Sequence, residues 1–343
     1  MRIAQVAPLY EPVPPHLYGG TERVVSWLTE ELVRRGHEVT LFASGDSRTA
    51  ARLVAPYPRG LRLDPSPPDA VALHVIELAQ AFERADDFDI LHCHVDYLAF
   101  PFGRLVHTPA VHTVHGRLDL RHLVHLFAQF PEAPLVSISD SQRRPLASLR
   151  PNWLSTVHHG LPVDEIPWQR SSSGGYLAFL GRMSHEKRPD LAIEVAKAVG
   201  IPLRIAAKVD DSDRKYFERE IRPLLSHPLV EFVGEVDERQ KWSFLGDALC
   251  LLFPIDWPEP FGLAMIEALA CGTPVVARPC GSVPEVVRDG ANGWLGDTVE
   301  QLASAIKRID LIDRATCRRD AETRFSVAAM TDHYERVYRR LVG

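Results

Sequence analysis

Features that define several other protein classes are missing from this chain of 343 residues. No stretch approaches the roughly 18 uninterrupted apolar residues that a transmembrane helix needs. Cysteine is scarce, odd in number and free of C-x-x-C pairs; the five positions are Cys93, Cys250, Cys271, Cys280 and Cys317. This pattern argues against a disulfide framework or a zinc site, and it predicts a reducing, cytoplasmic location.

An excess of positive charge is also absent. Lysine and arginine total 39 against 45 aspartates and glutamates, which gives a formal net charge of -6. A general nucleic-acid binder needs a basic field, so we expect no nucleic-acid partner. The apolar run at Met1–Pro8 is too short for a signal peptide, and no strongly basic amphipathic helix predicts docking to a membrane.

Short β-rich runs alternate with helical patterns along the chain, which predicts α/β architecture with parallel sheets covered by helices on both faces. The first strand is expected at Arg2–Ala7, and a proline-rich loop follows it. Gly19-Gly20 then opens a helix that runs to about Arg35, with Thr21 as its N-cap. The same strand–loop–helix pattern restarts with an apolar strand at Tyr176–Leu180.

The length of the chain favours two domains. We expect the first over residues 1–160 and the second over 176–326. Residues 161–175, rich in proline, serine and glycine, have the composition of a linker. A final helix is expected within 327–343, and its sequence leaves it free to pack back onto the first domain.

Two cations occupy the loop that follows the apolar strand of the second half. Arg182 offers a planar fork to phosphate oxygens, and Lys187 offers a mobile point charge. The spacing alone fits a solvated turn equally well. The position favours an anion site, because ligands of α/β domains bind at the carboxyl ends of the strands.

Two glutamates follow a later apolar strand, Leu249–Phe253. Glu259 precedes a proline, which disfavours helix at this position, whereas Glu267 lies a little over one turn into the next helix. Each on its own fits a surface charge. Together with the two cations and a helix N-terminus, they predict a site for a nucleotide diphosphate that carries a sugar. The cations would take the phosphates and the carboxylates would take hydroxyl groups.

The first half carries weaker signals. His115 ends a strand-like run, which suits either a substrate contact or a structural histidine. His92 and His94 share one face of a strand, but no third ligand has firm spacing, so we expect no metal site. Gly19-Gly20 lies in the first strand–helix loop, where a diphosphate or acceptor contact is expected.

These residues together resemble the retaining glycosyltransferases of family 4. The resemblance is strongest between residues 176 and 296, and the family's usual Asn-Gly at the end of the first domain is His159-Gly160 here. The motifs that carry it are Gly181-Arg182…Lys187, Phe232–Val236, Glu259…Glu267, Ala270–Ala277 and, more loosely, Tyr18–Glu22 and Thr113–Gly116. The resemblance implies a GT-B fold, in which two Rossmann-like, doubly wound parallel-sheet domains face each other across a cleft.

The resemblance also implies roles for individual residues. Arg182 and Lys187 would bind the donor diphosphate, Glu259 the donor sugar, and Glu267 the ribose. His115 would touch the sugar near its 6-hydroxyl. The loop with Gly234 and Val236 would lie against the base. The remaining donor contacts would come from Gly19, Gly20, Phe261, Gly262 and Leu263.

The implied activity is metal-independent, retaining transfer of a hexose to a hydroxyl acceptor by front-face attack, without a cofactor. The donor would be a UDP-sugar in preference to a GDP-sugar, and the acceptor a small molecule, a glycan or a lipid-linked sugar; only the last would bring the chain to a membrane. A sugar-nucleotide epimerase on the same fold and a non-catalytic nucleotide-sugar binder remain as alternatives. An oxidoreductase is disfavoured, because no G-x-G-x-x-G follows the first strand.

Overall fold

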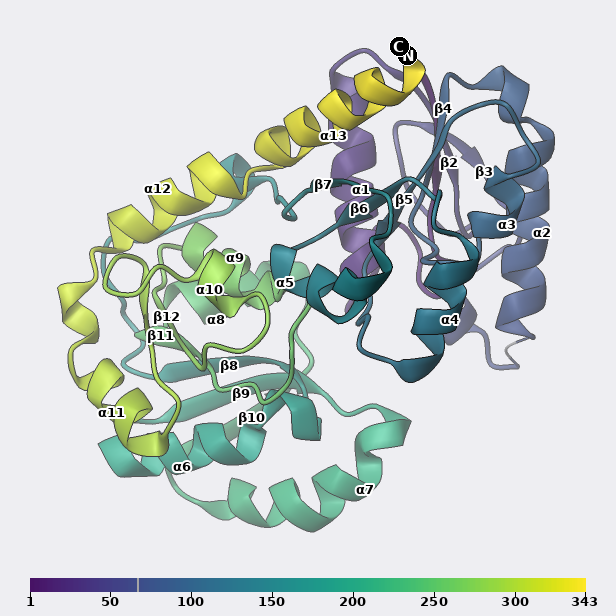
Figure 1. Cartoon of the computed structure of the whole chain (residues 1–343). Helices are drawn as coiled ribbons and strands as arrows, with labels where there is room; N and C mark the ends of the chain where they lie inside the picture. Colours follow the sequence, from purple (N-terminus) through teal and green to yellow (C-terminus); the bar gives the residue numbers. More distant parts are fainter. Residues whose placement is uncertain (67) are drawn as a thin grey trace. The chain divides into compact units, whose positions relative to one another are not determined.

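In the computed structural model of the chain, residues 1–66 and 68–343 are described. Contacts between Cα atoms divide the chain into two units (Figure 1). The first unit comprises Met1–Leu161 and Val327–Gly343, and the second comprises Pro162–Ser326. None of the helices in the described part of the chain combines the length and apolarity needed to cross a bilayer.

The first unit contains a parallel sheet of seven strands in the order β3-β2-β1-β4-β5-β6-β7. The central strands are buried along almost their whole length, as expected where helices cover both faces of a sheet. The strand order reverses between β1 and β4, which is the point where doubly wound sheets bind ligands. The strands are β1 (Arg2–Val6), β2 (Glu38–Phe42), β3 (Arg52–Val54), β4 (Ile90–Cys93), β5 (Ala110–Val114), β6 (Leu135–Ser137) and β7 (Trp153–Thr156).

The first helix begins two residues earlier than its expected cap allows. Gly20 is its first residue and Gly19 occupies the N-cap position, so the prediction of Thr21 as N-cap is wrong. A Cβ atom on Gly19 would lie 2.7 Å from the Cβ of Pro15, so glycine allows the proline-rich loop to pack closely here. The helices of this unit are α1 (Gly20–Arg34), α2 (Ala70–Glu83), α3 (Phe100–Gly103), α4 (Arg121–Gln129), α5 (Asp140–Arg143) and α13 (Val327–Val342), with short turns η1 (Leu61–Leu63), η2 (Ala85–Asp87) and η3 (Arg144–Leu149).

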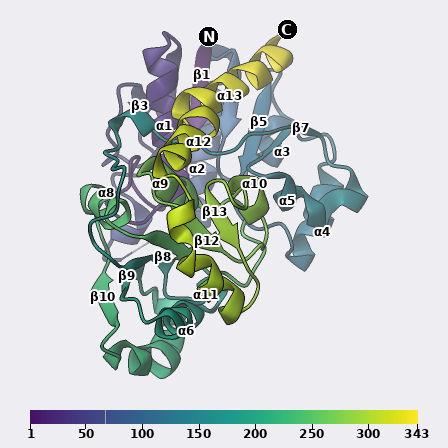
Figure 2. The ribbon, with the colours of Figure 1, turned by 90° about the vertical axis from the view of Figure 1, so that its left-hand side faces the viewer.

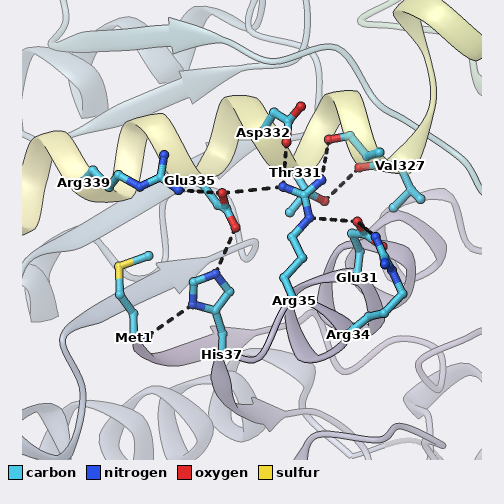
Figure 3. A network of polar contacts seen from close by, with 11 residues as sticks. Met1, Glu31, Arg34, Arg35, His37, Val327, Thr331, Asp332, Glu335 and Arg339 are labelled. Carbon is cyan, nitrogen blue, oxygen red and sulfur yellow. Dashed lines mark hydrogen bonds and ion pairs between the residues drawn. The ribbon is translucent and has the colours of Figure 1, made fainter.

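The C-terminal helix α13 packs along α1 in the first unit (Figures 1 and 2). Figure 3 shows the polar contacts that join them: Arg35, which follows α1, donates to Asp332 of α13 at 2.6 Å and lies 3.5 Å from Glu335. Beneath these contacts, Tyr334 and Tyr338 of α13 are fully buried. The last helix of the chain therefore completes the core of the unit that contains the first strand.

The second unit contains a parallel sheet of six strands in the order β10-β9-β8-β11-β12-β13. Its order reverses between β8 and β11, again a switch point. Apolar side chains of the central strands and of the covering helices form the core. The strands are β8 (Leu177–Arg182), β9 (Leu203–Lys208), β10 (Val230–Gly234), β11 (Cys250–Phe253), β12 (Val275–Ala277) and β13 (Gly293–Leu295).

Residues 214–226 form three short helical pieces and no continuous α-helix. α7 (Arg214–Tyr216) passes into a π-helical turn, η7 (Phe217–Ile221), and then into the 3-10 turn η8 (Arg222–Ser226). Pro223 lacks the N–H that would continue an α-helix. The other helical elements are η4 (Val163–Glu165), η5 (His185–Lys187), α6 (Pro189–Val199), η6 (Asp211–Asp213), α8 (Glu238–Gly246), α9 (Leu263–Ala270), α10 (Val283–Val286), α11 (Val299–Lys307), η9 (Ile309–Leu311) and α12 (Arg314–Arg324).

Buried arginines of α12 donate hydrogen bonds to residues 161–175, the segment that has the composition of a linker. Arg318 donates to the carbonyl of Val163 at 2.7 Å and to that of Ile166 at 2.9 Å. Arg314 donates to the carbonyl of Gln169 at 3.0 Å. Residues from Pro162 onward accordingly group with the second unit.

Candidate active site

The candidate site of the second unit is built on two loops at the switch point. β8 ends at Arg182 and leads into the turn that contains Lys187, whereas β11 leads into the loop that contains Glu259. β8 and β11 are parallel neighbours, so both loops leave the same edge of the sheet. The N–H of Asp256 donates to the carbonyl of Glu186 at 2.9 Å, which joins the two loops directly.

Lys187 and Glu259 form an ion pair between these loops. The ammonium of Lys187 contacts Oε2 of Glu259, and the indole N–H of Trp257 donates to the same oxygen at 3.0 Å. The ammonium also lies 5.3 Å from the ring centres of Phe253 and Trp257. Glu259 is only 8% exposed, so the interpretation of this residue as an exposed loop charge is wrong.

Arg182 lies among carboxylates at the end of β8. Its Nη1 atom is 3.4 Å from Asp210 and 3.7 Å from Asp213, and its Nη2 atom is 3.4 Å from Glu186. These are long separations for charge-assisted hydrogen bonds, which are usually 2.7–2.9 Å. A phosphate group bound to Arg182 would therefore compete with loosely held carboxylates.

A second ion-pair network, which the sequence did not predict, holds the two loops together. Asp256 lies 3.2 Å from Arg188, beside the turn that carries Lys187, and 2.8 Å from Arg278, which follows β12. The Arg278 guanidinium lowers the pKa of Asp256, and Arg188 lowers it further. The adjacency of Arg188 to Lys187 was the only sign of this network in the sequence, because the other partners come from distant strands.

The Glu259 turn is supported from behind by the loop after β12. A Cβ atom on Gly281 would lie 2.3 Å from the backbone nitrogen of Glu259, so glycine is needed for this close approach. Ser282 donates from its N–H to the carbonyl of Glu259 at 3.0 Å and from its hydroxyl to that of Phe261 at 2.8 Å. These contacts fix the backbone that leads into α9.

Helix α9 runs from Leu263 to Ala270, so Glu267 lies a little over one turn into it, as the sequence predicts. Gly262 occupies the N-cap position with a φ of 84°, which favours glycine, and Phe261 is buried against Phe325. The first N–H groups of a helix have no partner within the helix. The backbone at Leu263 and Ala264 is thus suited to receive an anion or a hydroxyl oxygen.

Glu267 is buried on α9 and paired with a residue that the sequence analysis did not identify. Nζ of Lys241 lies 2.5 Å from Oε1 of Glu267, and the two residues are 8% and 5% exposed. The surface-charge interpretation of Glu267 is therefore wrong. Lys241 belongs to α8, which follows the loop with Gly234 and Val236. Neither this helix nor the direction of the side chain was predicted from the sequence.

In the first unit, His115 follows β5 and is linked to the neighbouring strand ends. Nε2 of His115 lies 2.9 Å from Nδ1 of His94, and Nε2 of His94 lies 2.8 Å from Oε1 of Gln5. Burial lowers the pKa of His115 to about 3, so its ring is neutral at pH 7. Gly19 and Gly20 follow β1, on the same edge of the sheet.

Both ring nitrogens of His92 form hydrogen bonds with hydroxyl groups of the protein. Nδ1 lies 2.7 Å from the hydroxyl of Tyr338, and Nε2 lies 2.7 Å from that of Thr113. Within residues 1–66 and 68–343, no three His, Cys, Asp or Glu side chains are grouped so that they could hold a metal ion. His159, which stands where the family usually has Asn, is buried and stacks on His115 with ring centres 5.3 Å apart.

Two doubly wound parallel-sheet units define the GT-B class of fold, and solved structures of this class match the whole chain. AviGT4, a glycosyltransferase involved in avilamycin A biosynthesis, is 23% identical, with a TM-score of 0.78 over 100% of this chain and 98% of its own. Anabaena Alr3699/HepE, solved in complex with UDP and glucose, is 16% identical, with a TM-score of 0.77 over 99% of this chain and 100% of its own.

Family models then identify the chain more closely. Glycosyltransferase Family 4 matches residues 18–165, and Glycosyl transferases group 1 matches residues 165–322. The chain therefore belongs to the family 4 glycosyltransferases of group 1. Curated relatives named D-inositol 3-phosphate glycosyltransferase are 28% identical in Mycobacterium marinum and 29% identical in Mycobacterium tuberculosis, over 77% of this chain. The chain spans 66% and 64% of the length of these two relatives.

Proposed function

We propose that this protein is a retaining glycosyltransferase that moves a hexose from a nucleotide-diphosphate sugar to a hydroxyl acceptor, without a divalent metal or cofactor. The observation that carries the proposal is the pairing of Lys187 with Glu259 at the switch point, beside Arg182. A cation for phosphate and a carboxylate for hydroxyl groups occupy adjacent loops there. This is the arrangement that a sugar joined to a diphosphate requires.

In the proposed mechanism, Arg182 and Lys187 bind the diphosphate and stabilise the charge that develops as it leaves. Fixed cations that face developing charge lower the barrier because they need little reorganisation during the reaction. When phosphate takes the place of Glu259 beside Lys187, the carboxylate of Glu259 becomes available to hydroxyl groups of the sugar. Glu267 accepts hydrogen bonds from the ribose, and His115 contacts the sugar near its 6-hydroxyl.

The bond between the anomeric carbon and the phosphate oxygen breaks through an oxocarbenium-like state. The acceptor oxygen attacks from the face that the diphosphate leaves, so the configuration is retained. A phosphate oxygen takes the proton of the acceptor hydroxyl. In this mechanism no metal ion offsets the negative charge of the departing nucleotide. Arg182 and Lys187 offset it instead.

UDP is the nucleotide that we favour, and the structures of Anabaena Alr3699/HepE with UDP and with UDP-glucose support it as the first donor nucleotide to test. The names of the mycobacterial relatives support inositol 3-phosphate as the first acceptor to test.

A thermal-shift screen of UDP, GDP, ADP and their sugars tests the donor site. A ligand that binds only the folded protein raises the melting temperature, so the nucleotide that raises it most identifies the base. If none of the nucleotides raised the melting temperature, the proposed donor site would be overturned.

Transfer assays test the chemistry. We expect product formation from a UDP-sugar, unchanged by EDTA, with the anomeric configuration of the donor preserved in the proton NMR spectrum of the product. Activity that EDTA abolishes and magnesium restores would overturn metal independence, and an inverted product would overturn retention.

A further inference from the structure

One buried cation beside the candidate site has no role in the chemistry proposed above. Lys241 reaches from α8 to Glu267 on α9, with 2.5 Å between Nζ and Oε1. Both side chains are about nine-tenths buried, at 10% and 7% exposure. A buried ion pair is often no more stabilising than well-packed apolar side chains, so stability alone is a weak reason for its presence.

The position of Lys241 is fixed by the start of its helix. Asp237 caps α8 through a capping box with Gln240, and the N–H of Lys241 donates to the carbonyl of Asp237 at 2.9 Å. Lys241 therefore lies one turn beyond the loop that contains Gly234 and Val236. This is the loop to which the family resemblance assigns the nucleobase.

Further contacts hold α8 against the α9 region. The hydroxyl of Thr273 donates to the carbonyl of Leu245 at 2.7 Å, and the thiol of Cys271 lies 3.7 Å from the carbonyl of Trp242. Arg314 donates to both Thr273 and the carbonyl of Gly246, at 2.8 and 2.6 Å. Because these bonds hold α8 against the turn that follows α9, the ammonium of Lys241 is held in a defined place relative to Glu267.

We propose that Lys241 is a positioning residue that determines recognition of the ribose. Its ammonium holds the Glu267 carboxylate in the orientation that accepts hydrogen bonds from the 2′- and 3′-hydroxyls of a ribonucleoside diphosphate. The ion pair thereby couples the ribose contact on α9 to the base loop that precedes α8. This inference rests on the proposed donor function.

The test compares the affinity of UDP with that of 2′-deoxy-UDP and 3′-deoxy-UDP by calorimetry. The proteins are the wild type, Lys241→Gln, Lys241→Arg and the control Arg204→Gln. Arg204 forms a more exposed ion pair with Glu231 in the same unit, so its replacement removes an equal charge away from the candidate site. Each variant is first shown to be folded by its melting curve.

We expect the wild type to bind UDP about 10-fold more tightly than either deoxy analogue, because a hydrogen bond to a charged group is lost. Lys241→Gln should bind UDP and its analogues with affinities within about 3-fold of one another, since the carboxylate is no longer held in place. Lys241→Arg should restore most of the preference, and Arg204→Gln should behave like the wild type.

A folded Lys241→Gln protein that keeps the full preference would overturn the positioning role, and so would a wild type that binds UDP without preferring the ribose. The comparison of UDP with its deoxy analogues on the wild type needs no variant, so the proposal can still be overturned if Lys241→Gln does not fold. If ADP or GDP binds in place of UDP, the deoxy forms of that nucleotide are compared. Absence of binding by every nucleoside diphosphate would overturn the proposed function itself.

Discussion

The ammonium of Lys187 and the carboxylate of Glu259 contact each other from two loops that follow neighbouring strands, β8 and β11. Each residue is predicted to bind a different part of one ligand, the diphosphate and the sugar. In the structure the two groups satisfy each other. This pairing explains how a buried carboxylate and a largely buried ammonium are tolerated, since an unpaired buried charge is costly.

Replacement of Lys187 by alanine should lower turnover by about 100-fold or more, because one preorganised electrostatic partner of the transition state is worth roughly 3 kcal/mol. Steady-state kinetics with the donor identified by the binding screen measures the effect. Lys197→Ala, which removes the same charge from an exposed position on α6, is the control and should leave turnover unchanged. A near-normal rate for a folded Lys187→Ala protein would remove this residue from the mechanism.

Replacement of Gly281 by alanine should displace Glu259 and reduce turnover by at least about 10-fold, since small misplacements of a positioning group have large kinetic costs. The new Cβ would lie 2.3 Å from the backbone nitrogen of Glu259. Gly290→Ala is a matched control, because Gly290 also has a positive φ, of 77°, but its Cβ would meet Trp294 at an ordinary 3.5 Å. Melting temperatures and kcat/KM are compared for both variants. Equal kinetic effects would show that backbone strain alone, rather than the position of Glu259, is responsible.

The order of elements around the candidate site could be predicted from the sequence, because apolar strands followed by polar loops are local patterns. Lys187 and Glu259 were correctly placed after strands for this reason, whereas Arg182 is the last residue of β8 and not part of the loop that follows it. Their contacts could not be predicted in the same way. The pairing of Lys187 with Glu259 depends on β8 and β11 becoming neighbours, although β9 and β10 lie between them in the chain.

Helix α12 was missed for a different physical reason. Its sequence lacks an apolar stripe, and its buried face includes Arg314 and Arg318, which donate to backbone carbonyls of distant segments. A pattern search for amphipathic helices cannot recognise a polar buried face. The same arginines hydrogen-bond to the segment at residues 162–175, which belongs to the second unit, whereas local composition alone predicts a linker over residues 161–175.

Acid should lower the stability of the first unit because of its buried histidines. The contribution of His112 can be measured. It is buried on β5 against Phe100, and burial lowers its pKa to about 3 from an ordinary value of 6.5. Between these two values the unfolded chain binds a proton that the folded chain does not. The stability that neutral His112 contributes is therefore complete above pH 6.5 and is lost progressively as the pH falls towards 3.

Compared with His112→Phe, the wild type should lose about 2 kcal/mol more of its free energy of unfolding between pH 6.5 and 5, at about 1.4 kcal/mol per pH unit. Urea denaturation of both proteins at the two pH values measures this difference. Glu22, whose pKa burial raises to about 7, has the opposite pH dependence, but it is present in both proteins and cancels. Identical changes in the two proteins would show that the fold does not lower the pKa of His112.

Replacement of Arg318 by methionine should destabilise the second unit by about 3 kcal/mol or more. The guanidinium donates to three buried carbonyls, those of Val163, Ile166 and Ala270, at 2.7 to 2.9 Å. Removing it leaves these acceptors without a partner, at a cost of about 1–3 kcal/mol each. Arg319→Met, next to it in sequence but largely exposed, should change stability by no more than about 0.5 kcal/mol. Denaturation by urea measures both variants.

Limited digestion with trypsin distinguishes local release of the segment from general destabilisation. Arg170 lies in this segment and is exposed, and the chain is held just before it by the bond from Arg314 to Gln169. If Arg318 anchors residues 163–166, its replacement should speed cleavage after Arg170 under conditions where the folded state still predominates, because local opening needs less free energy than global unfolding. If Arg318→Met were cleaved no faster than its global unfolding predicts, other contacts would be shown to hold the segment in place.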